Sequence, residues 1–298
     1  MFCKITVDSW NATLSLFDII TDKNSGWVFR GQADAQWNLE TKFVREARGY
    51  RCNDSYWYRN REKYILQDFQ RGAHNYVQNL PESENYVDWL SLLQHHGGPT
   101  RFLDFSYSVY VALFFAVETA IHDSAIWAVN INKTFERLPD YQNYREFKKL
   151  QTYDDIIYNN NQWANEIIKD RKADDVVLLL EPFKQHERII KQQGLFLFPG
   201  NIEKPFESNI CSIFGLSFDD LSSPNAQNVG LSEIDKFDFS NISICKIVIP
   251  SILHSKAILE LRNMNITSAS LFPGIDGFAR SLSYRFCEIE YFVSSRLS

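Results

Sequence analysis

The sequence lacks any apolar run that approaches the roughly 18 uninterrupted residues of a membrane-spanning helix. Its first residues, MFCKITVDSW, also lack the long apolar core of a secretory signal. Only five cysteines are scattered along the 298 residues, and none forms a Cys-x-x-Cys pair. This spacing indicates neither a disulfide framework nor a zinc site. We therefore expect a cytoplasmic protein with reduced thiols and no membrane association.

An excess of positive charge is missing too, because 31 Lys and Arg face 37 Asp and Glu and give a net charge of −6. Proteins that coat nucleic acid need a concentrated positive face, so general nucleic-acid binding is not expected, whereas a local basic groove remains compatible with the sequence. Aromatic residues are plentiful at 15%, including 23 Phe and 14 Tyr. Such side chains mostly pack in cores, and some could stack on a base or a nicotinamide ring.

The apolar pattern predicts one α+β domain without internal repeats. Continuous apolar runs, typical of strands covered on both faces, alternate with segments of helical periodicity. Strands are predicted at 27–30, 125–132, 175–181, 195–198, 242–249 and 286–293, with a further apolar stretch at 39–44. Helices are predicted at 57–80, 88–96, 109–120 and 251–263. Two polar segments, 133–172 and 201–240, are interpreted as insertions that form either lids, partner surfaces or ordinary surface elaboration.

Arg30 stands at the end of the first predicted strand, in VFRGQADAQW. An Arg in this place is either a surface ion-pair partner or a guanidinium fork that holds an anionic ligand at two points. We predict that it lies in a pocket.

The densest polar cluster is LLQHHGGPTRFLDFSYS, between a helix end and a helix start. Gly97 and Gly98 allow a sharp turn and close approach of a ligand, and the next helix begins with backbone N–H groups that attract anions. A purely structural role is the alternative, with serine caps and an Arg101–Asp104 ion pair. The polar members of the cluster are Gln94, His95, His96, Thr100, Arg101, Asp104, Ser106 and Ser108.

A metal site is not predicted there, because the adjacent His95 and His96 would point in different directions on a regular element. Later in the chain, ERIIKQQGLFLFP places Arg188, Gln192 and Gln193 before a strand.

Acidic candidates gather near the C-terminal end of the sequence. SASLFPGIDGFA forms a tight loop that presents Asp276, and CEIEYF places Glu288 and Glu290 on one face of a predicted strand. Paired acids of this kind are either solvated surface groups or catalytic carboxylates.

Four of these motifs resemble the FRG domain, a bacterial family named after its Phe-Arg-Gly motif. They are FRGQ, LLQHHGGPTRFLDFS with ALFFA, RIIKQQGLFLF and SLFPGIDGFA, in this order over about residues 20–285. The family name by itself assigns no chemistry.

A weaker resemblance is to the Arg–Ser–Glu pattern of ADP-ribosyltransferases, carried by Arg30, by Ser106 with the 112–116 helix, and by Glu288-x-Glu290. It implies a mixed, split central β-sheet flanked by helices, with NAD as the cofactor. Its implied cofactor-binding residues are Arg30, Gly31, Gln32, Gln94, Thr100, Arg101 and Ser106. Its implied catalytic residues are Arg30, His95, Asp104, Asp276, Glu288 and Glu290.

Under this resemblance an Arg fork grips the NAD pyrophosphate, and a carboxylate stabilises the oxocarbenium charge that forms as the glycosidic bond breaks. The middle motif here is Leu-Asp-Phe-Ser instead of Ser-Thr-Ser, and Asp276 competes with Glu288 and Glu290 for the acid's role. The resemblance also implies an RNA, DNA or protein acceptor, a toxin or antiphage role, and a neutralising antitoxin or chaperone.

Two other functions remain open from the sequence. One is a non-catalytic module that recognises a nucleotide or nucleic acid. The other is a metal-dependent nuclease or other hydrolase that uses His95 and Asp104.

Overall fold

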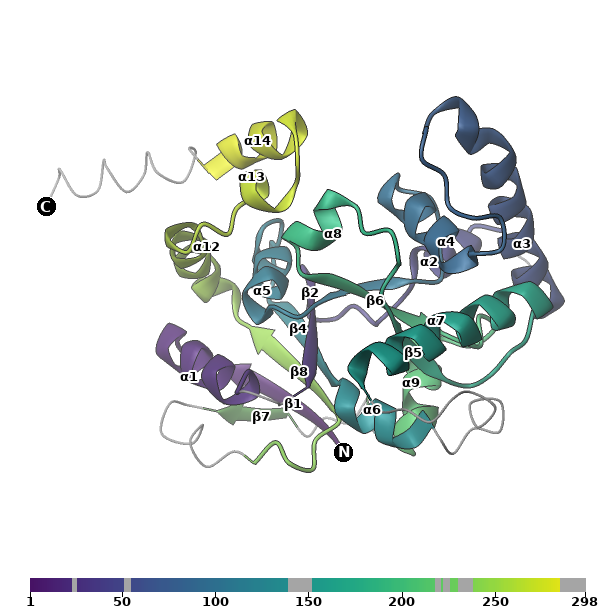
Figure 1. The fold of residues 1–298 in the computed structure, drawn as a ribbon. Helices are drawn as coiled ribbons and strands as arrows, with labels where there is room; N and C mark the ends of the chain where they lie inside the picture. The colour runs from purple at the N-terminus through teal and green to yellow at the C-terminus, as the bar shows by residue number, and fades with distance from the viewer. Residues whose placement is uncertain are drawn as a thin grey trace, which may run out of the picture.

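The computed structural model describes residues 1–22, 26–50, 55–138, 152–217, 221, 226–229 and 238–284. Strands of these residues join in one sheet (Figure 1) with the spatial order β5-β6-β3-β2-β4-β8-β1-β7. Its strands are β1 (Phe2–Val7), β2 (Trp27–Gln32), β3 (Leu103–Ser106), β4 (Ser124–Asn130), β5 (Val177–Leu180), β6 (Gly194–Pro199), β7 (Ala226–Val229) and β8 (Ile244–Ile249). The sheet is mixed, since β1 pairs in parallel with β7 and β8 while the other neighbours are antiparallel.

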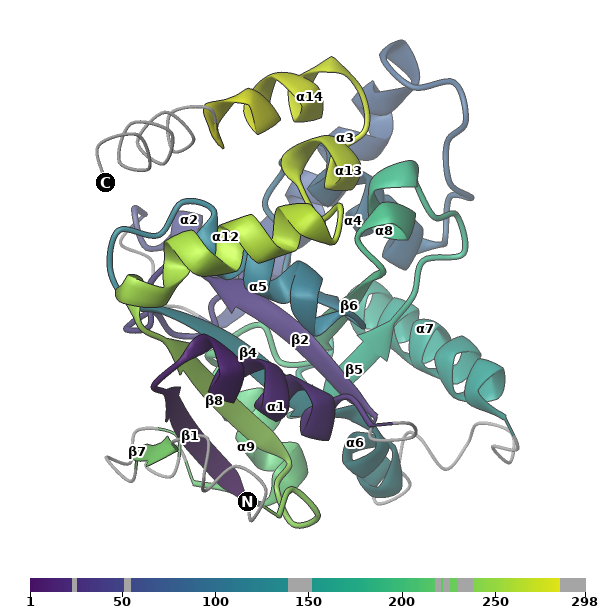
Figure 2. The same cartoon turned by 90° about the vertical axis from the view of Figure 1, so that its left-hand side faces the viewer.

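Helices cover both faces of this sheet. Figure 2 shows α1, α5 and α12 lying across one face, and α4, α7 and α9 contribute to the core on the other. The helices of the described residues are α1 (Trp10–Ile20), α2 (Lys42–Ala47), α3 (Ser55–Gly72), α4 (Tyr86–His95), α5 (Val109–Val117), α6 (Ile131–Arg137), α7 (Tyr153–Asp170), α8 (Glu187–Lys191), α9 (Phe206–Phe214), α12 (His254–Asn263), α13 (Ser268–Leu271) and α14 (Ile275–Ser281). The predicted α+β class with a mixed central sheet is confirmed.

Strand alternation explains the two cores. Successive side chains of a strand point to opposite faces, and in β2 Val28 enters one core while Phe29 enters the other. Both are almost fully buried. The continuous apolar runs of the sequence therefore reflect a sheet that is covered on both sides.

The sheet is nearly divided between β2 and β3. These strands pair at a single residue pair, Phe29 with Ser106, whereas β2 and β4 pair at six positions. Strands β5, β6 and β3 lie on one side of this single residue pair and the other five strands on the other, within one continuous sheet.

Most predicted elements are present with shifted ends. The helix predicted at 57–80 stops at Gly72, and the helix predicted to start after Ser251 begins at His254 after a short 3-10 turn. The apolar stretch 39–44 leads into α2, whereas β1 and α1 were not predicted. The strand predicted at 286–293 lies outside the described residues.

The two polar segments interpreted as insertions each supply part of the core. From segment 133–172, α7 buries Trp163 and Ile167, and from segment 201–240, α9 buries Phe206 and Ile210. Within the described residues, no helix combines the length and the apolar character needed to cross a bilayer.

Gly31 sets the distance between β2 and α5. A Cβ atom built on Gly31 would lie 2.0 Å from the carbonyl oxygen of Ala112 and 2.6 Å from the backbone nitrogen of Ala116. Both neighbours are backbone atoms of α5, so they cannot rotate away. Glycine at this position lets the helix pack directly on the strand.

We expect Gly31→Ala to lower the free energy of unfolding by about 1–3 kcal/mol, because strand and helix must separate. Urea denaturation measures the change. Gly72→Ala is the matched control, since a Cβ atom there meets nothing within 4 Å, and it should be neutral or stabilising by about 0.5 kcal/mol. Equal stability of the two variants would contradict this account of Gly31.

Candidate functional site

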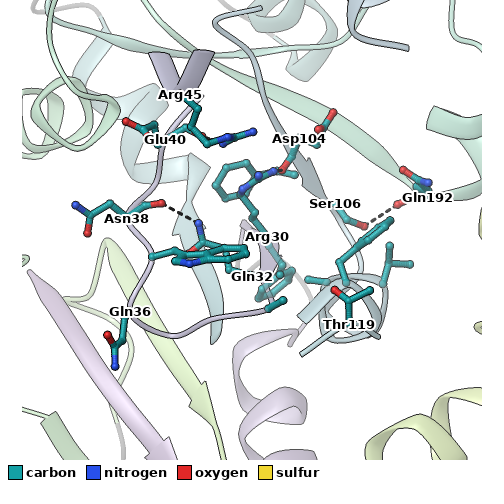
Figure 3. Close-up of a pocket in the computed structure, with 18 of the residues that line it drawn as sticks. Arg30, Gln32, Gln36, Asn38, Glu40, Arg45, Asp104, Ser106, Thr119 and Gln192 are labelled. Atoms are coloured by element: carbon teal, nitrogen blue, oxygen red, sulfur yellow. Dashed lines mark hydrogen bonds between the residues drawn. The ribbon is translucent and has the colours of Figure 1, made fainter. Parts of the chain in front are cut away.

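A cavity of about 720 Å³ opens at the end of β2, beyond the point where β2 and β3 stop pairing (Figure 3). Its walls come from both of these strands, from α5 and α8, from the region of α2, and from the segment 33–40, called here the wall loop. The polar side chains around it include Arg30, Gln32, Gln36, Asn38, Glu40, Arg45, Arg48, Asp104, Ser106, Thr119, Arg188 and Gln192.

Arg30 spans the gap between the diverging strands. Its Nη1 atom donates a 2.7 Å hydrogen bond to the backbone carbonyl of Asp104 on β3. Its Nε atom is buried and has no hydrogen-bond partner among the described residues. Burial lowers the pKa of the guanidinium, and the nearby Asp104 carboxylate opposes that shift. Arg30 thus lines the cavity as a fixed cation, as predicted, and is not a surface ion-pair partner.

Positive charge prevails around the cavity, with four arginines against two carboxylates. The two carboxylates are already engaged. Glu40 pairs with Arg48 at 2.5 Å, and the Oδ1 atom of Asp104 accepts a 2.7 Å hydrogen bond from Gln94. A cavity with this balance attracts an anionic ligand.

Aromatic surface accompanies the charge. Trp37 of the wall loop lines the cavity and is 55% exposed. Phe105 and Phe115 line the cavity from β3 and α5. Arg188 lies with its guanidinium 4.9 Å from the centre of the Phe272 ring. Flat rings beside arginines suit a ligand that has both phosphate and an aromatic group.

Three buried side chains hold the wall loop in place. Lys246 donates to the carbonyl of Trp37 at 3.3 Å, Gln32 donates to the carbonyl of Asn38 at 2.9 Å, and Glu207 accepts from the backbone N–H of Leu39 at 2.8 Å. Burial lowers the pKa of Lys246 to about 8 and raises that of Glu207. The wall loop is therefore a fixed part of the cavity.

Five of the predicted site residues line the cavity, and three of these have structural tasks. Gly31 permits close packing, and Gln32 accepts from the Trp127 indole at 2.8 Å while it holds the wall loop. The Ser106 hydroxyl donates to the carbonyl of Gln192 at 2.7 Å and accepts from the backbone N–H of Ser108. Arg30 and Asp104 are the two whose charges face the cavity.

Arg101 corrects one expectation, because it lies in the core and does not line the cavity. Only 1% of its surface is exposed, and its Nε atom donates to Glu62 at 2.6 Å. Further bonds reach the carbonyls of Pro199 and Gly200. The alternative Arg101–Asp104 ion pair is also wrong, since Glu62 is the partner.

Thr100 is likewise buried away from the cavity. Its hydroxyl donates to the side chain of Gln94 and accepts from the backbone N–H of Phe102. Gln94 in turn donates to Asp104, so Thr100 and Gln94 support a cavity residue without lining the cavity. Thr100 and Gln94 were predicted to contact a cofactor, whereas in the structure they support Asp104.

His95 lies in a cluster of three histidines outside the cavity lining. Its ring centre is 3.9 Å from that of His186 and 4.9 Å from that of His96. His186 caps α8, because its Nδ1 atom accepts from the backbone N–H of Ile189 at 3.3 Å. Burial and the neighbouring cations lower the pKa of His95, and they lower that of His186 to about 4. Both rings are neutral at pH 7.

The predicted C-terminal acids do not join the described site. Asp276 is exposed on α14 and does not line the cavity. Glu288 and Glu290 lie outside the described residues. Within the described residues, no group of three His, Cys, Asp or Glu side chains is arranged to hold a metal ion.

Several residues that line the cavity or support its wall loop were not identified by the sequence analysis. Arg45 and Arg48 come from the region of α2 and carry no motif, although a local excess of basic residues marks this part of the sequence. Lys246 could have been identified from the sequence, because it is a lone lysine within the apolar strand ICKIVI. Arg188 and Gln192 were noted before their strand, and the structure brings both to the cavity.

Comparison with protein families finds the FRG domain at residues 25–125. The predicted resemblance is confirmed over this stretch, which holds FRGQ and the LLQHHGGPTRFLDFS block. The other two motifs, at 188–198 and 270–279, fall outside it. Searches of curated proteins and of solved structures found no match.

We expect Arg101→Ala to lower the free energy of unfolding by about 3–5 kcal/mol, since it leaves Glu62 as a buried, unpaired charge. The double variant Glu62→Leu/Arg101→Met should recover much of that loss. Arg48→Ala is the control, because the Arg48 side chain is 71% exposed and its pair with Glu40 should contribute only about 0–1 kcal/mol. Urea denaturation compares them, and an Arg101→Ala protein as stable as the parent would refute the structural role.

His186 should make stability depend on pH. Its pKa is about 4 in the folded protein and about 6.5 when unfolded. The unfolded chain therefore binds the proton first, and the free energy of unfolding falls as pH drops from about 6.5 toward 4. His186→Asn, which can still cap α8, should make this slope shallower in urea titrations at several pH values. The exposed His122→Asn should leave the slope unchanged, and an unchanged slope in both variants would contradict the assignment.

Proposed function

We propose that the chain is an NAD-dependent ADP-ribosyltransferase whose dinucleotide binds in the Arg30 cavity. The observation that carries the proposal is the charge of the cavity wall, where Arg30 lies with three further arginines against two carboxylates. Phosphate oxygens are strong acceptors for guanidinium groups. The cavity volume of about 720 Å³ lies within the usual range of about 300–1,000 Å³ for cofactor sites.

The other walls support the same ligand. Arg45, Arg48 and Arg188 supply further positive charge for a pyrophosphate, and Trp37 offers an exposed ring for stacking. The wall loop that carries Trp37 is held by buried side chains, so little ordering is needed when the ligand enters.

In the proposed reaction the bond between nicotinamide and the ribose carbon breaks, and that carbon bonds to a nucleophilic atom of the acceptor, which releases its proton. Positive charge develops on the ribose as the first bond breaks. Asp104 is the cavity carboxylate that we assign to stabilising it, because it faces the cavity from β3 while Glu40 is bound to Arg48. The assignment of Asp104 rests on its position in the cavity lining. Gln94 orients the Asp104 carboxylate through a hydrogen bond.

A toxin or antiphage effector with a neutralising partner is the cellular role proposed with this activity. Toxicity that disappears in an Arg30→Ala strain would support that role.

One observation favours a second candidate, a recognition module that binds a nucleotide without turnover. Both carboxylates of the cavity lining are engaged by hydrogen bonds or an ion pair, so binding groups outnumber groups available for chemistry. Binding of NAD without release of nicotinamide would select this candidate. No observation on the described residues favours the metal-dependent nuclease.

We expect Arg30→Ala to weaken NAD binding by at least tenfold and to abolish nicotinamide release, because it removes the buried cation at the cavity wall. Calorimetry measures the binding, and release is assayed with RNA, DNA and protein extracts as acceptors. Arg30→Lys should restore only part of the binding, since Lys lacks the planar fork.

Arg137→Ala is the matched control, an exposed arginine on α6 outside the cavity, and it should behave as the parent. Thermal unfolding of each variant separates loss of ligand from loss of fold. A folded Arg30→Ala protein with parental NAD binding and turnover would overturn the proposal.

A further inference from the structure

A second, smaller hollow lies on the other side of α2 from the Arg30 cavity. Arg45 and Arg48 turn one face of the helix to the cavity, while Phe43, Glu46 and Ala47 line the hollow. This division follows from the helical period, which places residues three and four apart on one face. The hollow measures about 250 Å³, which is below the usual range of about 300–1,000 Å³ for a whole small ligand. It suits one part of a larger ligand.

Three aromatic residues, Phe43, Tyr50 and Trp57, line this hollow. Tyr50 is 68% exposed, Trp57 is half-buried on α3, and Phe43 packs against Tyr58 with ring centres 6.1 Å apart. The last contact fixes α2 against α3, which Figure 1 shows as the long helix at the outer edge of the molecule. Exposed rings on a fixed support are platforms on which a flat group can stack.

Arg61 adds a cation to the platform. Its guanidinium lies 5.1 Å from the centre of the Trp57 ring, and it has no carboxylate within ion-pair distance among the described residues. The carboxylate of the hollow, Glu46, is 3.6 Å from Lys42. Paired aromatic rings and arginines bind the bases and phosphates of single strands.

The surrounding charge favours a polyanion. Residues 42–63 contain seven Lys or Arg and three Asp or Glu, in a chain whose net charge is −6. The exposed members include Arg45, Arg48, Arg61 and Lys63. Nucleic-acid phosphates are drawn to such a concentration of basic side chains, whereas a protein acceptor of ordinary charge gains little from it.

We infer that this hollow binds a base of a single-stranded nucleic acid, and that nucleic acid is the acceptor in the proposed reaction. The role of nucleic acid as acceptor rests on the proposed function. Binding of nucleic acid to the hollow does not depend on that function. Because α2 is a wall of both the hollow and the cavity, a strand that stacks on Tyr50 and Trp57 continues along Arg45 and Arg48 toward the bound dinucleotide.

The test is fluorescence anisotropy with labelled 12-residue oligo(dT) and oligo(U), without NAD, at several salt concentrations. Tyr50→Ala and Arg61→Gln should each weaken binding about tenfold. Arg61→Gln should also reduce the slope of log affinity against log salt by about 0.7, the value for one phosphate contact on a single strand. The matched controls, Tyr158→Ala on α7 and Arg137→Gln on α6, are similarly exposed and should bind as the parent does.

Arg30→Ala separates the two proposals, because it should lose NAD and keep the oligonucleotide, whereas Tyr50→Ala should do the reverse. Oligonucleotide binding without nicotinamide release would support the hollow and overturn the transferase. Nicotinamide release with label on protein and no oligonucleotide binding would overturn the hollow and support the transferase. Equal binding by the hollow variants and their controls, or preference for duplex, would also overturn the inference.

Discussion

The hydrogen bond from Arg30 to the backbone carbonyl of Asp104 is the contact on which the site depends. The strands β2 and β3 pair once and then separate, so the sheet loses its ladder where the cavity begins. A side chain takes the place of the missing backbone bond and joins the two parts of the sheet. The same guanidinium belongs to a residue that lines the cavity. The residue that links the two strands is therefore also the one to which we assign binding of the proposed ligand.

Several segments that are distant in the sequence hold Arg30 and the cavity wall in position. Gly31 lets α5 approach β2 closely, and Lys246, Gln32 and Glu207 fix successive backbone groups of the wall loop. These buried polar contacts form because an irregular loop has no regular partners for its N–H and C=O groups. Burial disfavours the charged forms of Lys246 and Glu207. The wall is thus held at an energetic cost that its hydrogen bonds offset.

The sequence predicted the α+β class, most strands and the importance of Arg30, because apolar period and turn residues are local signals. The residue that a buried side chain pairs with is not determined by its neighbours in the sequence. Nothing near Arg101 shows that Glu62, 39 positions earlier, satisfies it in the core, and the nearer Asp104 was the natural but wrong partner. The polar composition of 133–172 concealed an amphipathic helix, α7, which buries Trp163. Histidines 95 and 96 looked like site residues, whereas contact with His186 places them in a separate cluster.

The six-residue helix α2 separates the cavity from the aromatic hollow, and a partition this short has a thermodynamic consequence. Occupants on its two sides share one wall, so any displacement of α2 that one occupant favours changes the affinity of the other. Linkage makes such an effect reciprocal, with the same factor in both directions. If both proposed ligands bind, α2 would therefore couple the two sites, because Arg45 faces one of them and Phe43 the other.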